Sequence, residues 1–523
     1  MRASPIAALL ILAGCSMPPT ATTPSGVQRE LVTLDAPAPP ENPVKHLATP
    51  AELDRARFLR YRLAGGASAL QAVVVCMPGM PAGAMAFDEL ARRLVTLADG
   101  AVEVWAVDRR ANLLEDLTGM QAAEQAGDPD LAWDYYDHGR LVEGRRFSGP
   151  PDRNEYMSEW GLATAVADLR AILDRVPRER QRTNLVLLGH SFGAAVVQAY
   201  AAWDLEGRAA GESLAGLVLL DGGVHMYAPI SEAAYLRGGT STAPGLEELR
   251  QGKGLYLSYY GFGLEAFLTV EITAMSAWLT PRREIRNTHT DRFATLLFLE
   301  QPPRLTAAAM VGFTIDDASS PLPGMRASCG GPDGPVEPFT HPLTGETRQR
   351  PPRASAGRLY DWRDFDQVTP REKTSVRVLA RVAHEGPSNR LEWYLPSRLA
   401  LDVNAARSLS LRPDDWQWRH GLRAGRNDRV DAPVLALLAG RGLVTSAALL
   451  EGYRRSLAPR VGDGRPRAGA GRDDGDGFKA LLLEDYAHDD LVHATAPEAE
   501  TELYRPLLGW ILANTSGELT LDE

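Results

Sequence analysis

Residues 184–193 read NLVLLGHSFG, and mostly small or apolar residues follow them. The apolar run from Leu185 to Leu188 predicts a buried strand, and the positions after the run predict a helix. When Gly-x-Ser-x-Gly joins a strand to a helix, the serine backbone is strained and its hydroxyl stands at the end of the strand. Gly189 and Gly193 fill the two places where the tight turn excludes a Cβ atom. The pattern therefore predicts Ser191 as a nucleophile.

A nucleophilic serine needs a base that accepts its proton. Residues 478–483 read FKALLL and predict a last short buried strand, and residues 486–491 read YAHDDL and predict a loop that enters a helix. His488 lies in that loop and is the predicted general base. His493, one helical turn later, is the local alternative.

The order of strand, Gly-x-Ser-x-Gly, helix and a late histidine after a final strand resembles the α/β-hydrolase superfamily. The resemblance covers both ends of the catalytic domain and not its middle. It implies an α/β fold in which a mostly parallel sheet is flanked by helices. It also implies a catalytic acid that lies between the serine and the histidine along the chain.

An oxyanion-binding loop is a second part of this resemblance. Residues 72–76 read AVVVC and predict the first central strand, and residues 77–81 read MPGMP. Members of the superfamily often carry a histidine where Pro78 stands, so the match is partial. Oxyanion stabilisation requires backbone N–H groups and is independent of their side chains. By this mapping the donors are the N–H groups of Met80 and Phe192.

The position of the acid departs from the common arrangement. The acid often follows the penultimate strand, here residues 434–438, but residues 439–444 read AGRGLV and contain no carboxylate. Asp431 precedes that strand and so lies at the wrong end of the sheet, because catalytic groups gather at the carboxyl ends of parallel strands. Asp221 follows the apolar run 217–220 and keeps the order serine, acid, histidine.

Asp221 is therefore the predicted acid, and some members of the superfamily place their acid there. An Asp-Gly-Gly turn after a strand also needs no function. Glu451 and Asp485 are the weaker substitutes.

The first residues of the chain resemble a bacterial lipoprotein signal peptide. Arg2 gives a positive start, residues 6–12 form a short apolar core, and residues 12–15 read LAGC. The apolar core is too short to span a bilayer. This resemblance implies that residues 1–14 are removed and that Cys15 is lipidated, which places the protein in the bacterial cell envelope. An ordinary secretory signal is the alternative. Residues 15–45 are rich in Pro, Thr and Ala and predict a disordered tether.

The composition fits a folded, exported protein. The chain has 523 residues, of which 44% are apolar, and its formal net charge is −11. The 56 basic residues form no stripe and are outnumbered by 67 acidic ones, which argues against nucleic acid as a partner. No later apolar run reaches the roughly 18 residues of a membrane span, so attachment would come from the lipid. Cys76 and Cys329 remain, and a buried free Cys76 is preferred over a disulfide between them.

The predicted domains follow from these anchors. Residues 46–225 and 431–523 form the α/β-hydrolase core, and residues 226–430 form a helical cap inserted over the active site. Apolar residues at three- and four-residue spacing predict helices within the cap, at 245–257, 264–279, 291–299, 371–384 and 389–408. Residues 316–353 are rich in Pro and Gly, lack this periodicity and predict a loop.

No motif for a metal or nucleotide cofactor is present in the sequence. The sequence thus predicts a lipid-anchored serine hydrolase that acts on small-molecule esters, with an apolar acyl or alcohol part favoured, and that needs no cofactor. The competing hypothesis is a binding or scaffold protein of the same fold whose triad has decayed, because the loop after the penultimate strand lacks an acid.

Overall fold

The computed structural model describes residues 26–36, 40–238, 244–257, 263–298, 303–342, 344–355, 357–388, 390–458 and 477–521. The predicted signal peptide, with Cys15, lies outside these ranges. Among the helices in these ranges, none has both the length and the apolar character that crossing a bilayer would require.

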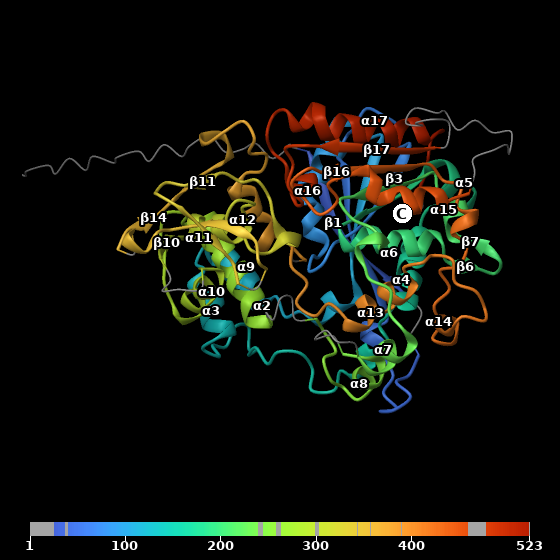
Figure 1. The fold of residues 1–523 in the computed structure, drawn as a ribbon, viewed down its shortest axis with the longest axis horizontal. Helices are drawn as coiled ribbons and strands as arrows, with labels where there is room; N and C mark the ends of the chain where they lie inside the picture. Colours follow the sequence, from blue (N-terminus) through green and yellow to red (C-terminus); the bar gives the residue numbers. More distant parts are fainter. Residues whose placement is uncertain are drawn as a thin grey trace, which may run out of the picture.

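An eight-stranded sheet forms the centre of the fold (Figure 1). Its order is β1-β2-β4-β3-β5-β8-β16-β17, and all strands from β4 to β17 run parallel. The first two strands are antiparallel to their neighbours. β1 lies within residues 15–45, so the predicted disordered tether is wrong for residues 27–35, whose backbone hydrogen bonds are made with β2. In sheet order the bounds are Val27–Asp35, Arg55–Leu63, Val102–Asp108, Ala72–Met77, Leu185–His190, Gly216–Leu220, Val434–Ala439 and Phe478–Leu483.

Helices cover both faces of this sheet, which explains why its central strands are continuous apolar runs. Side chains alternate along a strand, so Val73 and Val75 of β3 pack in one core cluster and Val74 and Cys76 in another. On the first face lie α4, Leu162–Leu173, and α6, Phe192–Ala201. On the other face lie α1, Asp88–Leu97, and α17, Arg505–Asn514. The smaller helices α5, α15 and α16 span Arg178–Asn184, Glu451–Ser456 and Asp490–His493.

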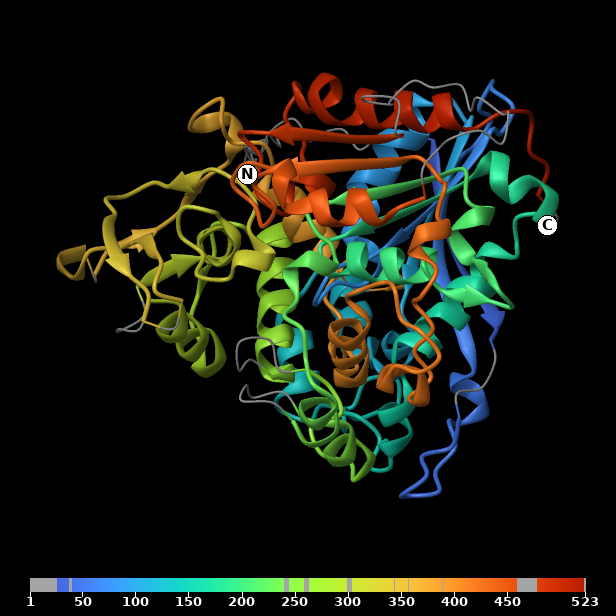
Figure 2. The ribbon, with the colours of Figure 1, turned by 45° about the vertical axis from the view of Figure 1, so that its right-hand side comes forward.

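The chain between β8 and β16 forms two packed groups of elements (Figures 1 and 2). One group packs on the α4 and α6 side of the core and comprises α7, α8, α13 and α14, which span Glu232–Arg237, Leu246–Arg250, Ser397–Ala406 and Trp416–Arg419. The other group lies beside the carboxyl end of β17 and comprises α9, α10, α11 and α12, which span Leu264–Leu279, Thr288–Phe298, Ala307–Ile315 and Val376–His384.

This insertion is less purely helical than its sequence predicts. Short strands β9 to β15 accompany the helices, at Glu284–Ile285, Arg304–Thr306, Gly331–Pro332, Glu337–Thr340, Thr347–Arg350, Leu359–Tyr360 and Trp362–Arg363. Three of them lie in the segment 316–353, which the sequence predicted as a loop. Strands of two to four residues are too short to produce an alternating pattern, so the sequence carries no signal for them.

A segment between β4 and α4 extends the core of the insertion. Helices α2, Thr118–Ala126, and α3, Asp130–Tyr136, contribute to the same apolar cluster as α9, α11 and α12. A small hairpin, β6 and β7, follows α6 at Asp204–Leu205 and Arg208–Ala209.

Candidate active site

Ser191 lies in the turn between β5 and α6, as the sequence predicts. Its φ and ψ are 55° and −122°, a conformation that side chains with a Cβ rarely adopt. The two glycines of the motif are required by close packing. A Cβ on Gly193 would lie 2.1 Å from the Met77 carbonyl oxygen, and one on Gly189 would lie 2.4 Å from the Gly193 oxygen. Close packing at Gly189 and Gly193 therefore holds Ser191 in its strained backbone conformation.

Asp221 and His488 meet at the edge of the sheet where the parallel strands have their carboxyl ends. Asp221 follows β8 and His488 follows β17, with β16 between these strands. His488 Nδ1 is 2.6 Å from Asp221 Oδ2, and both side chains are fully buried. Burial raises the pKa of Asp221, but the hydrogen bonds from His488, Leu443 and Val444 outweigh burial and hold this pKa below its usual value. The carboxylate is thus charged at neutral pH.

The loop after β16, which contains no carboxylate, contacts Asp221. Three backbone N–H groups from β16 and this loop donate to the Asp221 carboxylate, those of Leu443 at 2.7 Å, Val444 at 2.8 Å and Ala439 at 3.2 Å. A Cβ on Gly442 would lie 2.2 Å from Asp221 Oδ2, so the backbone approaches as closely as a glycine permits. This loop has no carboxylate of its own and instead binds the carboxylate of Asp221, which follows β8.

The second ring nitrogen of His488 is the one that does not contact Asp221. Within the part of the chain that the structure describes, Nε2 is buried and has no hydrogen-bond partner. His190 stacks on His488 with ring centroids 4.5 Å apart, and its Nε2 lies 3.2 Å from the His488 carbonyl oxygen. Burial, and next the neighbouring His488, lower the pKa of His190 to about 4. His190 is therefore neutral at neutral pH and adds no charge that would oppose protonation of His488.

Comparison with protein-family models and with curated sequences finds no match to this chain. The sheet order and the strained serine turn between β5 and α6 decide the fold class. The chain has the α/β-hydrolase fold.

Solved structures with this fold are similar at low sequence identity. A candidate lipase from Sulfolobus solfataricus is 12% identical, with 93% of this chain and 94% of that one covered and a TM-score of 0.44. A peroxisomal α/β-hydrolase from Saccharomyces cerevisiae is 10% identical, with 95% and 94% covered and a TM-score of 0.39. A haloalkane dehalogenase from Bradyrhizobium elkani is 12% identical, with 93% and 99% covered and a TM-score of 0.35. These likenesses concern the fold and identify no reaction.

The insertion between β8 and β16 holds the loop that carries His488. Asp489 forms a buried ion pair with Arg390, and its N–H donates to the Arg326 carbonyl at 2.7 Å. Asp490 accepts hydrogen bonds from the Ser328 hydroxyl at 2.7 Å and the Thr374 hydroxyl at 2.6 Å. Burial raises the pKa of Asp490 to about 7. The insertion is thus fastened to the residues directly after the histidine.

The other predicted groups are engaged elsewhere in the fold. Glu451 pairs with Arg454 and Arg455 on α15, and Asp485 pairs with Arg371 at the surface. Asp431 pairs with Arg182 at 2.5 Å. His493 is buried and accepts from Arg390 Nε at 3.3 Å. The acid that the structure brings to His488 is therefore Asp221.

The predicted oxyanion loop lies against the serine turn. A Cβ on Gly79 would lie 2.9 Å from the Cβ of Ser191, so the backbone on the N-terminal side of Met80 packs directly on the nucleophile. Phe192 is the first residue of α6, where backbone N–H groups have no partner within the helix. Both predicted donors thus belong to backbone next to Ser191.

Two further predictions concern side chains around the site. Cys76 and Cys329 are buried and free, so they form no disulfide. Burial raises the pKa of the Cys76 thiol, which keeps it protonated. The sequence also suggests Tyr136, Trp393 and Tyr394 as a lining for an acyl pocket, with core packing as the alternative. Tyr136 and Trp393 pack edge to face, with ring centroids 5.8 Å apart. Trp393 and Tyr394 are each 1% exposed, so core packing is their observed role.

Two clusters in the described residues bring potential metal ligands together: His190 with His488 and Asp489, and Asp316 with Asp317 and Glu372. The first belongs to the His488 site. In the second, Asp316 and Glu372 accept hydrogen bonds from the N–H groups of Cys329 and Gly330, and Asp317 pairs with Arg441. These acids already have protein partners.

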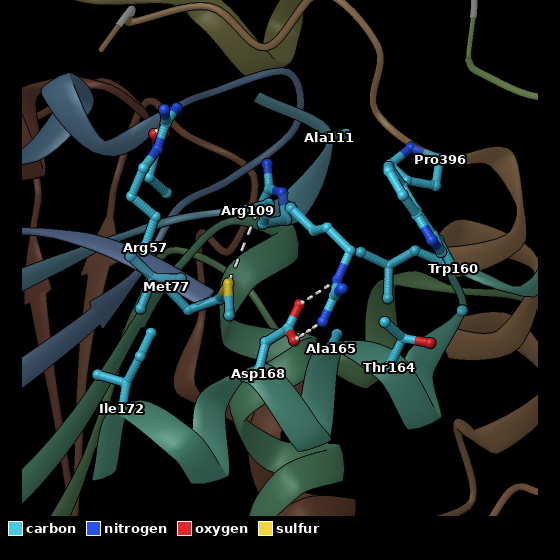
Figure 3. Close-up of a pocket in the computed structure, with 15 residues that line it drawn as sticks. Arg57, Met77, Arg109, Ala111, Trp160, Thr164, Ala165, Asp168, Ile172 and Pro396 are labelled. Atoms are coloured by element: carbon cyan, nitrogen blue, oxygen red, sulfur yellow. Dashed lines mark hydrogen bonds and ion pairs between the residues drawn. The ribbon is translucent and has the colours of Figure 1, made fainter. Parts of the chain in front are cut away.

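A cavity of about 30 Å³ lies between the ends of β3 and β4, α4 and α13 (Figure 3). Met77, Arg109, Trp160 and Pro396 are among the residues that line it. This volume admits a water molecule and not an acyl chain.

Proposed function

We propose that this protein is a serine hydrolase that cleaves carboxylic esters with Ser191, His488 and Asp221. The observation that carries the proposal is the 2.6 Å contact between His488 and Asp221, at the same edge of the sheet as the strained Ser191. A buried carboxylate on one ring nitrogen and a buried, unpartnered second nitrogen are what a general base beside a serine requires.

In this mechanism His488 Nε2 accepts the proton of the Ser191 hydroxyl as Oγ attacks the ester carbonyl carbon. The N–H groups of Met80 and Phe192 stabilise the resulting oxyanion, and each such donor typically contributes about 3 kcal/mol to the transition state. The tetrahedral intermediate expels the alcohol, which takes the proton from His488. Water then attacks the acyl-enzyme, with His488 again as base, and releases the acid and free Ser191. Asp221 fixes the tautomer of His488 throughout.

The competing hypothesis of a decayed scaffold rested on the missing acid after β16. That observation no longer favours it, because Asp221 stands beside His488 and the loop after β16 donates to it. The hydrogen bonds that Asp221 makes with His488, Leu443 and Val444 therefore support an enzyme over a decayed scaffold.

The hydrolase is expected to prefer esters with a sizeable apolar part. Ser191 is 6% exposed, and Tyr227 packs edge-on against the adjacent Phe192 at 6.0 Å. Each methylene that enters an apolar pocket contributes about 0.8 kcal/mol, so three or four would raise kcat/KM by roughly two orders of magnitude. Specificity constants for p-nitrophenyl acetate, butyrate, hexanoate and octanoate measure this. A flat or falling series would remove the apolar pocket and leave the serine mechanism in place.

We further propose that the protein is a lipoprotein of the bacterial cell envelope, anchored through Cys15. The support is the LAGC sequence at residues 12–15 after a short apolar run. Replacement of Cys15 by Ser should abolish incorporation of labelled fatty acid and move the protein out of the membrane fraction, with kcat unchanged. Wild-type protein that is wholly soluble and carries no label would contradict the anchor.

A further inference from the structure

The loop that carries Met80 is held by one buried arginine. Arg109 follows β4 and is 6% exposed. Its Nη1 donates to the Pro78 carbonyl at 2.6 Å, and its Nη2 donates to the carbonyls of Gly79 at 2.7 Å and Ala82 at 2.8 Å. These three carbonyls lie on both sides of Met80. A planar guanidinium has a fixed arrangement of donors, so it fixes the shape of the turn.

The contact to Gly79 bears directly on the proposed oxyanion donor. The carbonyl of Gly79 and the N–H of Met80 belong to the same planar peptide unit, in which a trans bond points them in opposite directions. Arg109 holds the Gly79 carbonyl oxygen, which lies in the same plane and points the opposite way. It therefore sets the direction of the Met80 N–H. The positive charge of the Arg109 guanidinium, next to the Gly79 carbonyl oxygen, also polarises the peptide unit and strengthens the Met80 N–H as a donor.

Arg109 is in turn fixed by the insertion. Glu392 is fully buried, and its Oε2 accepts from Arg109 Nε at 2.8 Å and lies 2.5 Å from Nη2, whose two N–H groups are shared among Glu392 and the carbonyls of Gly79 and Ala82. The same segment contacts the loop through its backbone, because the N–H of Gly83 donates to the Arg390 carbonyl at 2.7 Å. Arg390 also pairs with Asp489, next to His488. One segment of the insertion thus supports both sides of the proposed site.

The next residue shows that this arrangement is specific to Arg109. Arg110 is equally buried, but it pairs with Asp168 on α4 and with Asp54, and it donates to the Leu53 carbonyl at 2.7 Å. None of these partners belongs to the oxyanion loop. In Figure 3, a dashed line joins Arg109 to Met77, and Asp168 is joined to a different side chain. Arg110 therefore offers a matched control.

We infer that Arg109, held by Glu392, is a positioning residue that aims the Met80 N–H at the oxyanion. This inference rests on the proposed function. It makes the insertion a part of the catalytic arrangement, since the carboxylate that orients Arg109 comes from outside the α/β-hydrolase core.

The test compares Arg109→Met, Arg109→Lys and Glu392→Gln with Arg110→Lys. Active sites are counted with a fluorophosphonate, and folding is checked by circular dichroism. We expect Arg109→Met to lower kcat by about 10²-fold with KM within about threefold, as loss of a transition-state contact does. The inhibition constant of a trifluoromethyl ketone, whose adduct with serine carries an oxyanion, should rise in parallel. Arg109→Lys should recover part of the loss, because an ammonium group can still donate to a carbonyl. Glu392→Gln should lower kcat less than Arg109→Met, and Arg110→Lys should retain normal kcat.

Normal kcat and ketone affinity in a folded Arg109 variant would overturn the inference, and so would an equal loss in Arg110→Lys. If Arg109→Met does not fold, Arg109→Lys decides by the same measurements. A wild-type protein that neither turns over esters nor reacts with the fluorophosphonate would refute the proposed function itself, and the inference with it.

Discussion

Replacement of Ser191 by alanine is expected to lower kcat for ester hydrolysis by about 10⁶-fold, the size of effect seen when a triad nucleophile is removed. The reason is that the hydroxyl which forms the acyl-enzyme is lost, while the residues that bind substrate stay. The fold should persist, because alanine keeps the Cβ atom and the hydroxyl is a minor part of the packing. Steady-state kinetics and thermal unfolding of the two proteins measure both effects.

The control for this prediction compares the loss of kcat in two single variants with the loss in the double variant. His488→Ala should cost nearly as much as Ser191→Ala, and the double variant should be no slower than either, because the two groups act in one step. Losses that multiply in the double variant would mean that Ser191 and His488 act independently, which contradicts a triad.

Asp221→Asn is expected to lower kcat by about 10⁴-fold, because an amide next to His488 Nδ1 favours the wrong tautomer. Leu443 donates to Oδ2 and Val444 to Oδ1, so whichever oxygen the NH₂ group of asparagine replaces, one of these two backbone donors loses its acceptor. An unsatisfied buried donor costs about 1 to 3 kcal/mol, so the unfolding temperature should fall as well. Kinetics at saturating substrate, with the active fraction determined, separates the two losses.

Asp485→Asn and Glu451→Gln are the matched controls, since these carboxylates pair with surface arginines. Both variants should keep near-normal kcat. If either loses turnover while Asp221→Asn retains it, the acid is misassigned.

The parts of the site that sequence predicts well are those with local signals. The turn at Ser191 has apolar residues before it, small residues after it and glycines at both steric contacts. Asp221 is predicted because it follows a short apolar strand, and a parallel sheet brings such positions to one edge. His488 is predicted because it follows the final strand. The structure places the latter two side chains in contact.

The supporting contacts have no such signal. The donors to Asp221 are mainly backbone N–H groups of residues 439–444, and a backbone group looks the same at every residue. Arg109 and Glu392 are separated by 283 positions, so nothing local connects them. The one available sign was the pair of arginines directly after β4, because charged residues next to a buried strand need partners.

The insertion was also predicted incompletely, for a related reason. Helix α9 has 16 residues, enough to show a helical period, and the sequence predicts its bounds. The seven short strands of the insertion are stabilised by tertiary pairing, as when β10 joins β9 and β14. Except in the hairpin of β12 and β13, this pairing joins segments that are far apart in the chain, so no short window of sequence contains it.

The central claim is that Ser191 is an activated nucleophile, and covalent labelling tests it most directly. The purified protein is treated with a fluorophosphonate, its intact mass is measured, and the labelled peptide is sequenced by mass spectrometry, with Ser191→Ala treated alongside. The account predicts one adduct per chain, on Ser191, and none on the variant. An unlabelled wild-type protein, or equal labelling of Ser191→Ala, would contradict it.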